Sequence, residues 1–187
     1  MSRARRLHHA VTMQSTVVCL SHVRWQRDYE RPHHLLSRCA RDHRVLFIEP
    51  PELDRDEVAI EVSETRTGVL TVIPHLPPGL DEQTMENALR AIVDRVLSDL
   101  GDSYPVLWYY DPMALAFTDH LEASAVVYDR LDASKLAPSG TRALRESQLM
   151  KRADLVFQPE EPLDVSWDVT YTKLWAEVQS VVASSGN

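Results

Sequence analysis

The run Thr16-Val-Val-Cys-Leu20 decides the fold class of this chain. Apolar and polar side chains do not alternate in it, so the strand that it predicts must be buried on both faces. Such strands are typical of the inside of a parallel sheet that helices cover on each side. We therefore expect this strand near the centre of a mainly parallel sheet.

Further strands and helices alternate from this strand to about residue 157. The other expected parallel strands are short apolar runs: Arg44–Ile48, Val106–Tyr110, Ala125–Tyr128 and Leu155–Phe157. The expected helices begin near Pro32, Asp81, Met113 and Thr141. Strands that alternate with helices predict an α/β fold, here a Rossmann-like domain over residues 16–157 with helices on both faces of the sheet.

One hairpin interrupts the alternation. The segments Val58–Val62 and Val69–Ile73 flank a polar turn that contains Gly68, which predicts a hairpin or a pair of short edge strands. The helix that follows has the clearest periodicity in the chain. Asp81 can cap its first turn, and Gly101 is well placed to end it.

Composition limits the classes of partner. The chain has 187 residues, of which 44% are hydrophobic, and a formal net charge of −8. This acidity disfavours a nucleic-acid partner, because phosphate binding needs a basic surface. No apolar stretch approaches the length of a transmembrane helix.

The first residues do not form an export signal. Residues 1–15 begin with a basic stretch, but polar residues follow where an export signal would have an apolar segment. We expect these residues to form a flexible basic leader, with Met13 as an alternative start. Cys19 and Cys39 are expected to be small buried hydrophobes without a disulfide, which fits a cytoplasmic protein.

The C-terminal region departs from the strand and helix alternation. Residues 158–165 form a polar, proline-rich linker, and an amphipathic helix is expected over residues 166–183 with Ser166 as its cap. Large side chains share one face of this helix: Trp167, Tyr171, Leu174, Trp175 and Val178. So large an apolar face must be buried against the domain or against a partner, and we expect it to pack back on the domain.

Candidate binding residues follow from the sheet. Ligands of open parallel sheets bind outside the carboxyl ends of the strands, which selects His22, Arg24, Arg31 and Asp129 as substrate-binding candidates. Arginines before a helix N-terminus favour anions, and an aspartate can accept hydrogen bonds from sugar hydroxyls. The alternatives are a solvated Arg24, and an Asp129 that caps a helix or forms a salt bridge.

The sequence contains no motif for dinucleotide or phosphate binding, for a metal site or for a nucleophile elbow. The loop after the first strand has no glycine, so it is no dinucleotide or phosphate-binding fingerprint. No histidine or cysteine spacing indicates a metal site, and no nucleophile elbow is present. We expect no metal and no cofactor, and we assign no catalytic residue.

Several phrases together resemble one family. They are Leu20-Ser-His-Val-Arg-Trp25, Arg31-Pro-His-His-Leu-Leu-Ser-Arg38, Val72-Ile-Pro-His-Leu-Pro-Pro-Gly79, Leu107-Trp-Tyr-Tyr-Asp-Pro-Met-Ala114, Phe117-Thr-Asp-His-Leu121 and Val126-Val-Tyr-Asp129. They resemble the N-terminal, acceptor-side domain of bacterial GT-B glycosyltransferases of cell-surface polysaccharide synthesis. Some members of that family are named as, or fused to, UDP-galactopyranose mutase.

The resemblance implies transfer of a glycosyl group from a nucleotide sugar to a glycan acceptor, usually without a bound metal. Relatives continue after residue 157 into a donor-binding domain, whereas this chain continues directly to a helix that resembles the last helix of the family. The chain thus resembles a GT-B protein whose donor-binding domain is deleted. Glu30 stands where glutamine is expected, Asp111 stands where threonine is expected, and the loop after Asp129 looks shortened.

Three functions are compatible with these observations. The first hypothesis is that the chain is a glycosyltransferase half that works with a separate donor-binding domain or chain and is inactive alone. The alternative is a non-catalytic carbohydrate-binding or protein-interaction module that kept the fold. A third hypothesis is a remnant without a ligand.

Overall fold

The computed structural model describes residues 15–27, 29–101, 104–130, 140–158 and 166–185. Its strands are β1 (Thr16–Leu20), β2 (Arg44–Ile48), β3 (Ala59–Glu64), β4 (Val69–His75), β5 (Val106–Tyr109), β6 (Ala125–Asp129) and β7 (Leu155–Phe157). Its helices are α1 (Arg31–Cys39), α2 (Glu82–Leu100), the 3-10 helix η1 (Pro112–Ala114), α3 (Leu115–Thr118), α4 (Gly140–Arg152) and α5 (Trp167–Ser185).

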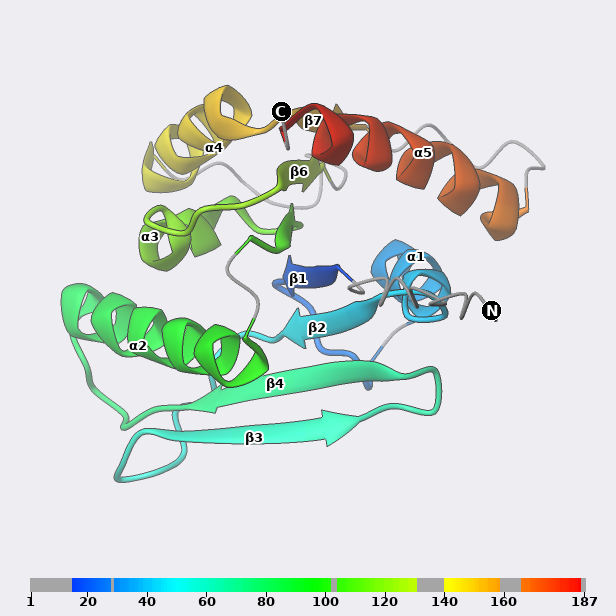
Figure 1. Cartoon of the computed structure of the whole chain (residues 1–187). Coiled ribbons are helices and arrows are strands. Elements are labelled where there is room, and N and C mark those ends of the chain that lie inside the picture. Colours follow the sequence, from blue (N-terminus) through cyan, green and yellow to red (C-terminus); the bar gives the residue numbers. More distant parts are fainter. Residues whose placement is uncertain (1–14, 28, 102–103, 131–139, 159–165, 186–187) are drawn as a thin grey trace, which may run out of the picture.

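These strands form one sheet in the order β3-β4-β2-β1-β5-β6-β7, with β1 at its centre (Figure 1). β1 pairs in parallel with β2 and β5, so that Val17 lies opposite Val45 on one side and Val106 on the other. All five residues of β1 are buried. The predicted position of this strand, and its burial on both faces, are confirmed.

The edge strand β3 runs antiparallel to β4, as the hairpin prediction required. Gly68 in the turn has a φ of 81°, a left-handed conformation that glycine adopts without steric cost. β4 itself pairs in parallel with β2, so it is an inner strand and only β3 is the edge strand that was predicted. The sheet is therefore parallel except at this edge, where the hairpin lies.

Helices cover both faces of the sheet (Figure 1). α1 and α5 pack on one face, around a core that includes Cys19, Phe47 and Trp175. α2, α3 and α4 pack on the other face, around a core that includes Leu20, Val93 and Leu149. The predicted α/β architecture is confirmed. Both cysteines are buried and free.

α2 begins and ends as predicted. The Asp81 carboxylate accepts a hydrogen bond from the backbone N–H of Thr84 at 2.9 Å, which satisfies a donor of the first turn. Gly101 closes the helix with a φ of 67°, and its N–H donates to the carbonyl of Leu97. The first turns of α2 lie at the carboxyl edge of β1 and β2, where the pocket described below is found.

The C-terminal helix packs back on the domain, as predicted. Trp175 is 8% exposed and Val178 is fully buried, and both belong to the core that α1 covers. Trp167, which we expected to be buried, is only half-buried because it lies in the first turn of α5, where its ring stacks on His34 at 4.3 Å. Asp168 pairs with Arg38 at 3.0 Å. The helix ends two residues after the predicted position.

Parts of some predictions lie outside the described residues. These parts are residues 1–14 of the expected leader, residues 131–139 of the loop after β6 and residues 159–165 of the linker. Among the helices in the described ranges, none has both the length and the apolar character that a bilayer crossing requires.

Candidate functional site at the carboxyl edge of the sheet

A pocket of about 340 Å³ lies at the carboxyl ends of β1 and β2, beside the loop that follows β5 and the first turns of α2. Its apolar lining includes Ile48, Pro50, Met85, Leu89, Met113 and Phe117. Its polar lining consists of Ser21, His22, Glu49, Glu82, Glu86 and Asp111. An apolar cavity with a few converging polar groups at this edge is the usual form of a ligand site in an open parallel sheet.

His22 is the sequence-predicted residue that lines this pocket. Two hydrogen bonds order its loop, from Ser21 N–H to the Ile48 carbonyl at 3.1 Å and from Val23 N–H to Ser21 Oγ at 3.1 Å. Burial lowers the pKa of His22, while the nearby Asp111 carboxylate opposes that shift. The ring is therefore neutral at pH 7.

The Nδ1 atom of His22 is buried and makes no hydrogen bond within the described part of the chain. A buried nitrogen without a partner lowers stability unless a ligand or water pairs with it. In a neutral ring this nitrogen can accept a hydrogen bond from a hydroxyl or donate one to an oxygen, depending on the tautomer. His22 thus places a buried nitrogen without a hydrogen-bond partner among the described residues in the wall of the pocket.

Asp111 follows β5 and also lines the pocket. Its Oδ1 atom accepts a hydrogen bond from the N–H of Met113 at 3.1 Å, which caps η1, and lies 3.1 Å from Nη1 of Arg142 in α4. The carboxylate is therefore held in place by a backbone donor and a cation. Sequence reasoning selected this segment by its place after a strand, but did not count Asp111 among the candidates.

Arg24 does not line the pocket. Its guanidinium lies 3.3 Å from Glu49 Oε2 and 3.4 Å from Glu52 Oε1, and it donates to the Pro51 carbonyl at 3.4 Å. Glu49 also accepts a hydrogen bond from the N–H of Trp25 at 3.1 Å. The alternative of a solvated Arg24 is therefore wrong, because this side chain joins the loop after β1 to the loop after β2.

Arg31 and Asp129 also lie outside the pocket lining, and they pair with each other. Nε of Arg31 lies 3.0 and 3.1 Å from the two carboxylate oxygens of Asp129, which is fully buried. Burial raises the pKa of Asp129, and Arg31, Tyr110 and Trp108 oppose this shift. Asp129 therefore forms a salt bridge, which was one of the alternatives to a role in ligand binding.

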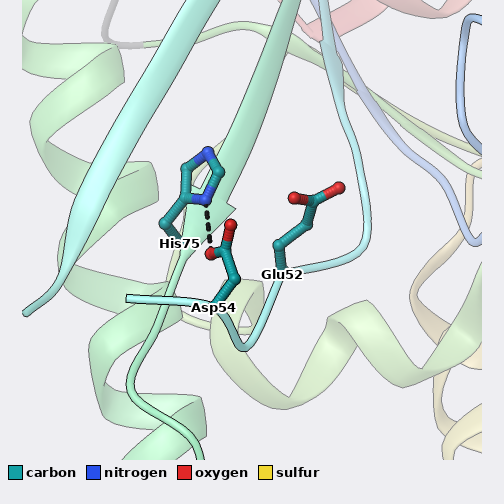
Figure 2. A group of neighbouring side chains, drawn as sticks. All are labelled: Glu52, Asp54 and His75. Carbon is teal, nitrogen blue, oxygen red and sulfur yellow. Dashed lines mark hydrogen bonds and ion pairs between the residues drawn. The ribbon is translucent and has the colours of Figure 1, made fainter. Parts of the chain in front are cut away.

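The sequence analysis missed a group of side chains that the loop after β2 and the end of β4 bring together. Glu52, Asp54 and His75 place one potential metal-ligand atom each within 4.8 Å of one another (Figure 2). The spacing of these three residues in the sequence is not typical of a metal motif, so they were not considered when we predicted that no metal binds. The predicted hairpin strand ended at Ile73, before His75, so it did not place this histidine near the loop.

No family model matches the chain, and a search of curated proteins finds no match. Among solved structures, a sucrose-phosphate synthase chain from Thermosynechococcus elongatus matches with a TM-score of 0.60 and 11% identity. The match covers 90% of this chain and 99% of that chain. The likeness shows the fold alone: this chain shares the Rossmann-like α/β architecture of that chain.

Two further structures match at lower TM-scores. One is described as trehalose-6-phosphate from E. coli bound with UDP-2-fluoro glucose, with a TM-score of 0.49, 12% identity and coverage of 76% of this chain and 39% of that one. The other is an α,α-trehalose-phosphate synthase (UDP-forming) from Burkholderia xenovorans in complex with glucose-6-phosphate, with a TM-score of 0.46 and 12% identity, covering 79% and 40%. This chain thus spans about two fifths of each, and we draw no inference from either.

Proposed function

We propose that this chain is the acceptor-side half of a GT-B glycosyltransferase and that its carboxyl-edge pocket binds a hydroxyl-bearing sugar acceptor. The observation that carries the proposal is the pocket itself, which combines an apolar floor with a neutral His22 and a fixed Asp111. Sugars present both apolar ring faces and hydroxyl groups. A pocket of this composition is suited to both.

The role of each polar group follows from its surroundings. A sugar hydroxyl can pair with the buried Nδ1 of His22, which makes no hydrogen bond within the described residues. Asp111 can accept a hydrogen bond from a second hydroxyl, because Arg142 and the Met113 N–H hold its carboxylate in position. The buried Glu49 at the base of the pocket orders the loop that carries His22, through Trp25 and Arg24.

The arginine candidates have a supporting role in this proposal. Arg24 joins two loops at the edge of the pocket, and Arg31 neutralises the buried carboxylate of Asp129 beneath the same edge. Both arginines carry charge that would otherwise be available to a phosphate. The acceptor that we propose is therefore a neutral glycan or oligosaccharide more readily than a sugar phosphate.

A second wall is needed for glycosyl transfer. We infer that a donor-binding domain, on a separate chain or on another part of the protein, would hold the nucleotide sugar opposite this pocket. The family resemblance supports a role in cytoplasmic assembly of cell-surface polysaccharide.

Calorimetric titration of the full chain with neutral oligosaccharides, hexose phosphates and nucleotide sugars tests the proposal. We expect saturable binding of a neutral saccharide, and weakening by about tenfold or more in H22Q and D111N, which corresponds to loss of one hydrogen bond of about 1.4 kcal/mol. The matched control is D94N, an exposed carboxylate on α2 that lies outside the pocket lining. Absence of saccharide binding, or equal weakening in D94N, would contradict the proposal.

A further inference from the structure

Glu52, Asp54 and His75 form a side-chain cluster that is separate from the pocket lining (Figure 2). Glu52 and Asp54 lie on the connector between β2 and β3, and His75 is the last residue of β4. The cluster therefore joins the end of an inner strand to the chain that leads to the edge strand. One imidazole nitrogen and two carboxylates are donors that transition metals accept.

The backbone holds two members of the cluster side by side. Glu52 donates its N–H to the Pro74 carbonyl at 2.8 Å, and its own carbonyl accepts from the N–H of Leu76 at 2.8 Å. These two bonds bracket His75, so Glu52 and His75 form an isolated parallel bridge. The backbones of two of the three ligand residues are thus held in place, which reduces the entropy lost on binding an ion.

His75 is buried although it lies at the end of β4, next to the edge strand. It is 4% exposed, and its Nδ1 atom lies 2.7 Å from Oδ1 of Asp54. Its Nε2 atom is also buried and makes no hydrogen bond within the described residues, although Oε2 of Glu61 lies 3.6 Å away. One buried imidazole therefore lies between two carboxylates, with Glu52 beside it.

We propose that this cluster binds a divalent transition metal ion, with Zn²⁺ as the best match. His75 Nδ1 and the carboxylates of Glu52 and Asp54 are the protein ligands, and water completes the coordination. Zn²⁺ takes nitrogen and oxygen ligands at about 2.0–2.2 Å. The imidazole is fixed by burial, whereas the side chains of Glu52 and Asp54 are 41% and 49% exposed and can close on the ion. For Glu52 this exchanges the contact of Oε1 with Arg24, at 3.4 Å, for the metal.

Glu61 completes the geometry as a positioning residue. Metal-bound histidines donate their other ring N–H to a carboxylate or carbonyl, which fixes the tautomer and the ring orientation. When Nδ1 binds the ion, Nε2 carries the proton and faces the Glu61 carboxylate. Because Glu61 lies on β3, the ion would link β3, β4 and the connector, and it would stabilise the edge of the sheet.

The experiment is a calorimetric titration of the EDTA-treated full chain with Zn²⁺. We expect one ion per chain and a rise of the melting temperature with Zn²⁺, because an ion that binds only the folded state stabilises it. E52Q and D54N should each weaken binding at least about tenfold, and E61Q should weaken it by about 10–100-fold while leaving the metal-free melting temperature unchanged. The absorption spectrum of bound Co²⁺ should change in E61Q if Glu61 orients the imidazole.

The chain offers a matched control on another surface. His120 Nε2 lies 2.6 Å from Oδ1 of Asp94, with Asp119 at 3.9 Å from the other ring nitrogen, so it is also an imidazole between two carboxylates. D94N should leave Zn²⁺ binding unchanged, and so should H8N/H9N, which removes the histidine pair near the N-terminus.

Three results would overturn the proposal. The first is no Zn²⁺ binding at millimolar concentration. The second is binding that D94N or H8N/H9N abolishes and D54N does not. The third is Mg²⁺ binding as tight as Zn²⁺ binding, because a hard ion that prefers oxygen ligands would not require the imidazole.

Discussion

Arg31 and Asp129 are 98 positions apart in the sequence and form a buried ion pair beneath the carboxyl edge of the sheet, with Nε 3.0 Å from Oδ1. The arginine begins α1 on one side of β1, and the aspartate ends β6 on the other side. The pair therefore connects the start of α1 to the end of β6. Because the Asp129 side chain is 0% exposed, its charge depends on Arg31 for compensation.

We expect R31M to lower the free energy of unfolding by about 3–5 kcal/mol, because it leaves a buried carboxylate without a counter-charge. Urea denaturation at pH 7 measures this loss. The double variant R31M/D129N should recover part of it, because the buried charge is then absent. R41A is the control, since Arg41 is 63% exposed and pairs with an exposed Asp168, so a change of about 0–1 kcal/mol is expected. A loss in R31M as small as that in R41A would contradict this reasoning.

The second prediction concerns α5. W175A should lower the free energy of unfolding by about 3–5 kcal/mol, because this side chain is 8% exposed in the core beside α1. W167A should have a smaller effect, because Trp167 is half-buried at the start of the helix. Thermal unfolding over a range of protein concentrations measures both. If W175A keeps its melting temperature and only loses self-association, the apolar face of α5 binds a partner chain and does not stabilise the domain.

The third prediction concerns pH. Burial lowers the pKa of His22 in the folded chain below the unfolded value near 6.5. Below that pH the unfolded chain binds more protons, so folding stability falls as pH drops from about 6.5 toward the folded pKa, and this effect is absent at higher pH. H22Q should therefore lose less stability than the wild type between about pH 7.5 and 5.5. Parallel pH dependence of the two melting temperatures would show that His22 is not responsible.

The fourth prediction concerns activity. The purified chain should transfer no sugar at a useful rate, because alignment of donor and acceptor in a closed cleft provides much of the rate and this chain supplies one wall. Incubation with a nucleotide sugar and an oligosaccharide, followed by mass spectrometry of the products, is the measurement. Efficient transfer by the chain without any partner would overturn the proposed division into two halves.

The sequence by itself determined the α/β architecture. Thr16–Leu20 is apolar on both faces, which required a central strand, and the alternation of strands and helices required parallel pairing. Asp81 and Gly101 marked the ends of α2 through local backbone chemistry. The apolar face of α5 predicted packing on the domain. Each of these features follows from residues that are close together in the sequence.

The contacts among charged side chains were decided only by the tertiary structure. Arg24 was expected near a ligand, but Glu49 and Glu52 from the next strand connection bind it. His75 meets Asp54 because the parallel pairing of β4 with β2 brings the end of β4 to the connector. The periodicity of apolar side chains indicates which face of a helix or strand is buried. The residue that pairs with a charged side chain depends instead on strand order and register. That order is set by packing over the whole sheet, which no short stretch of sequence specifies.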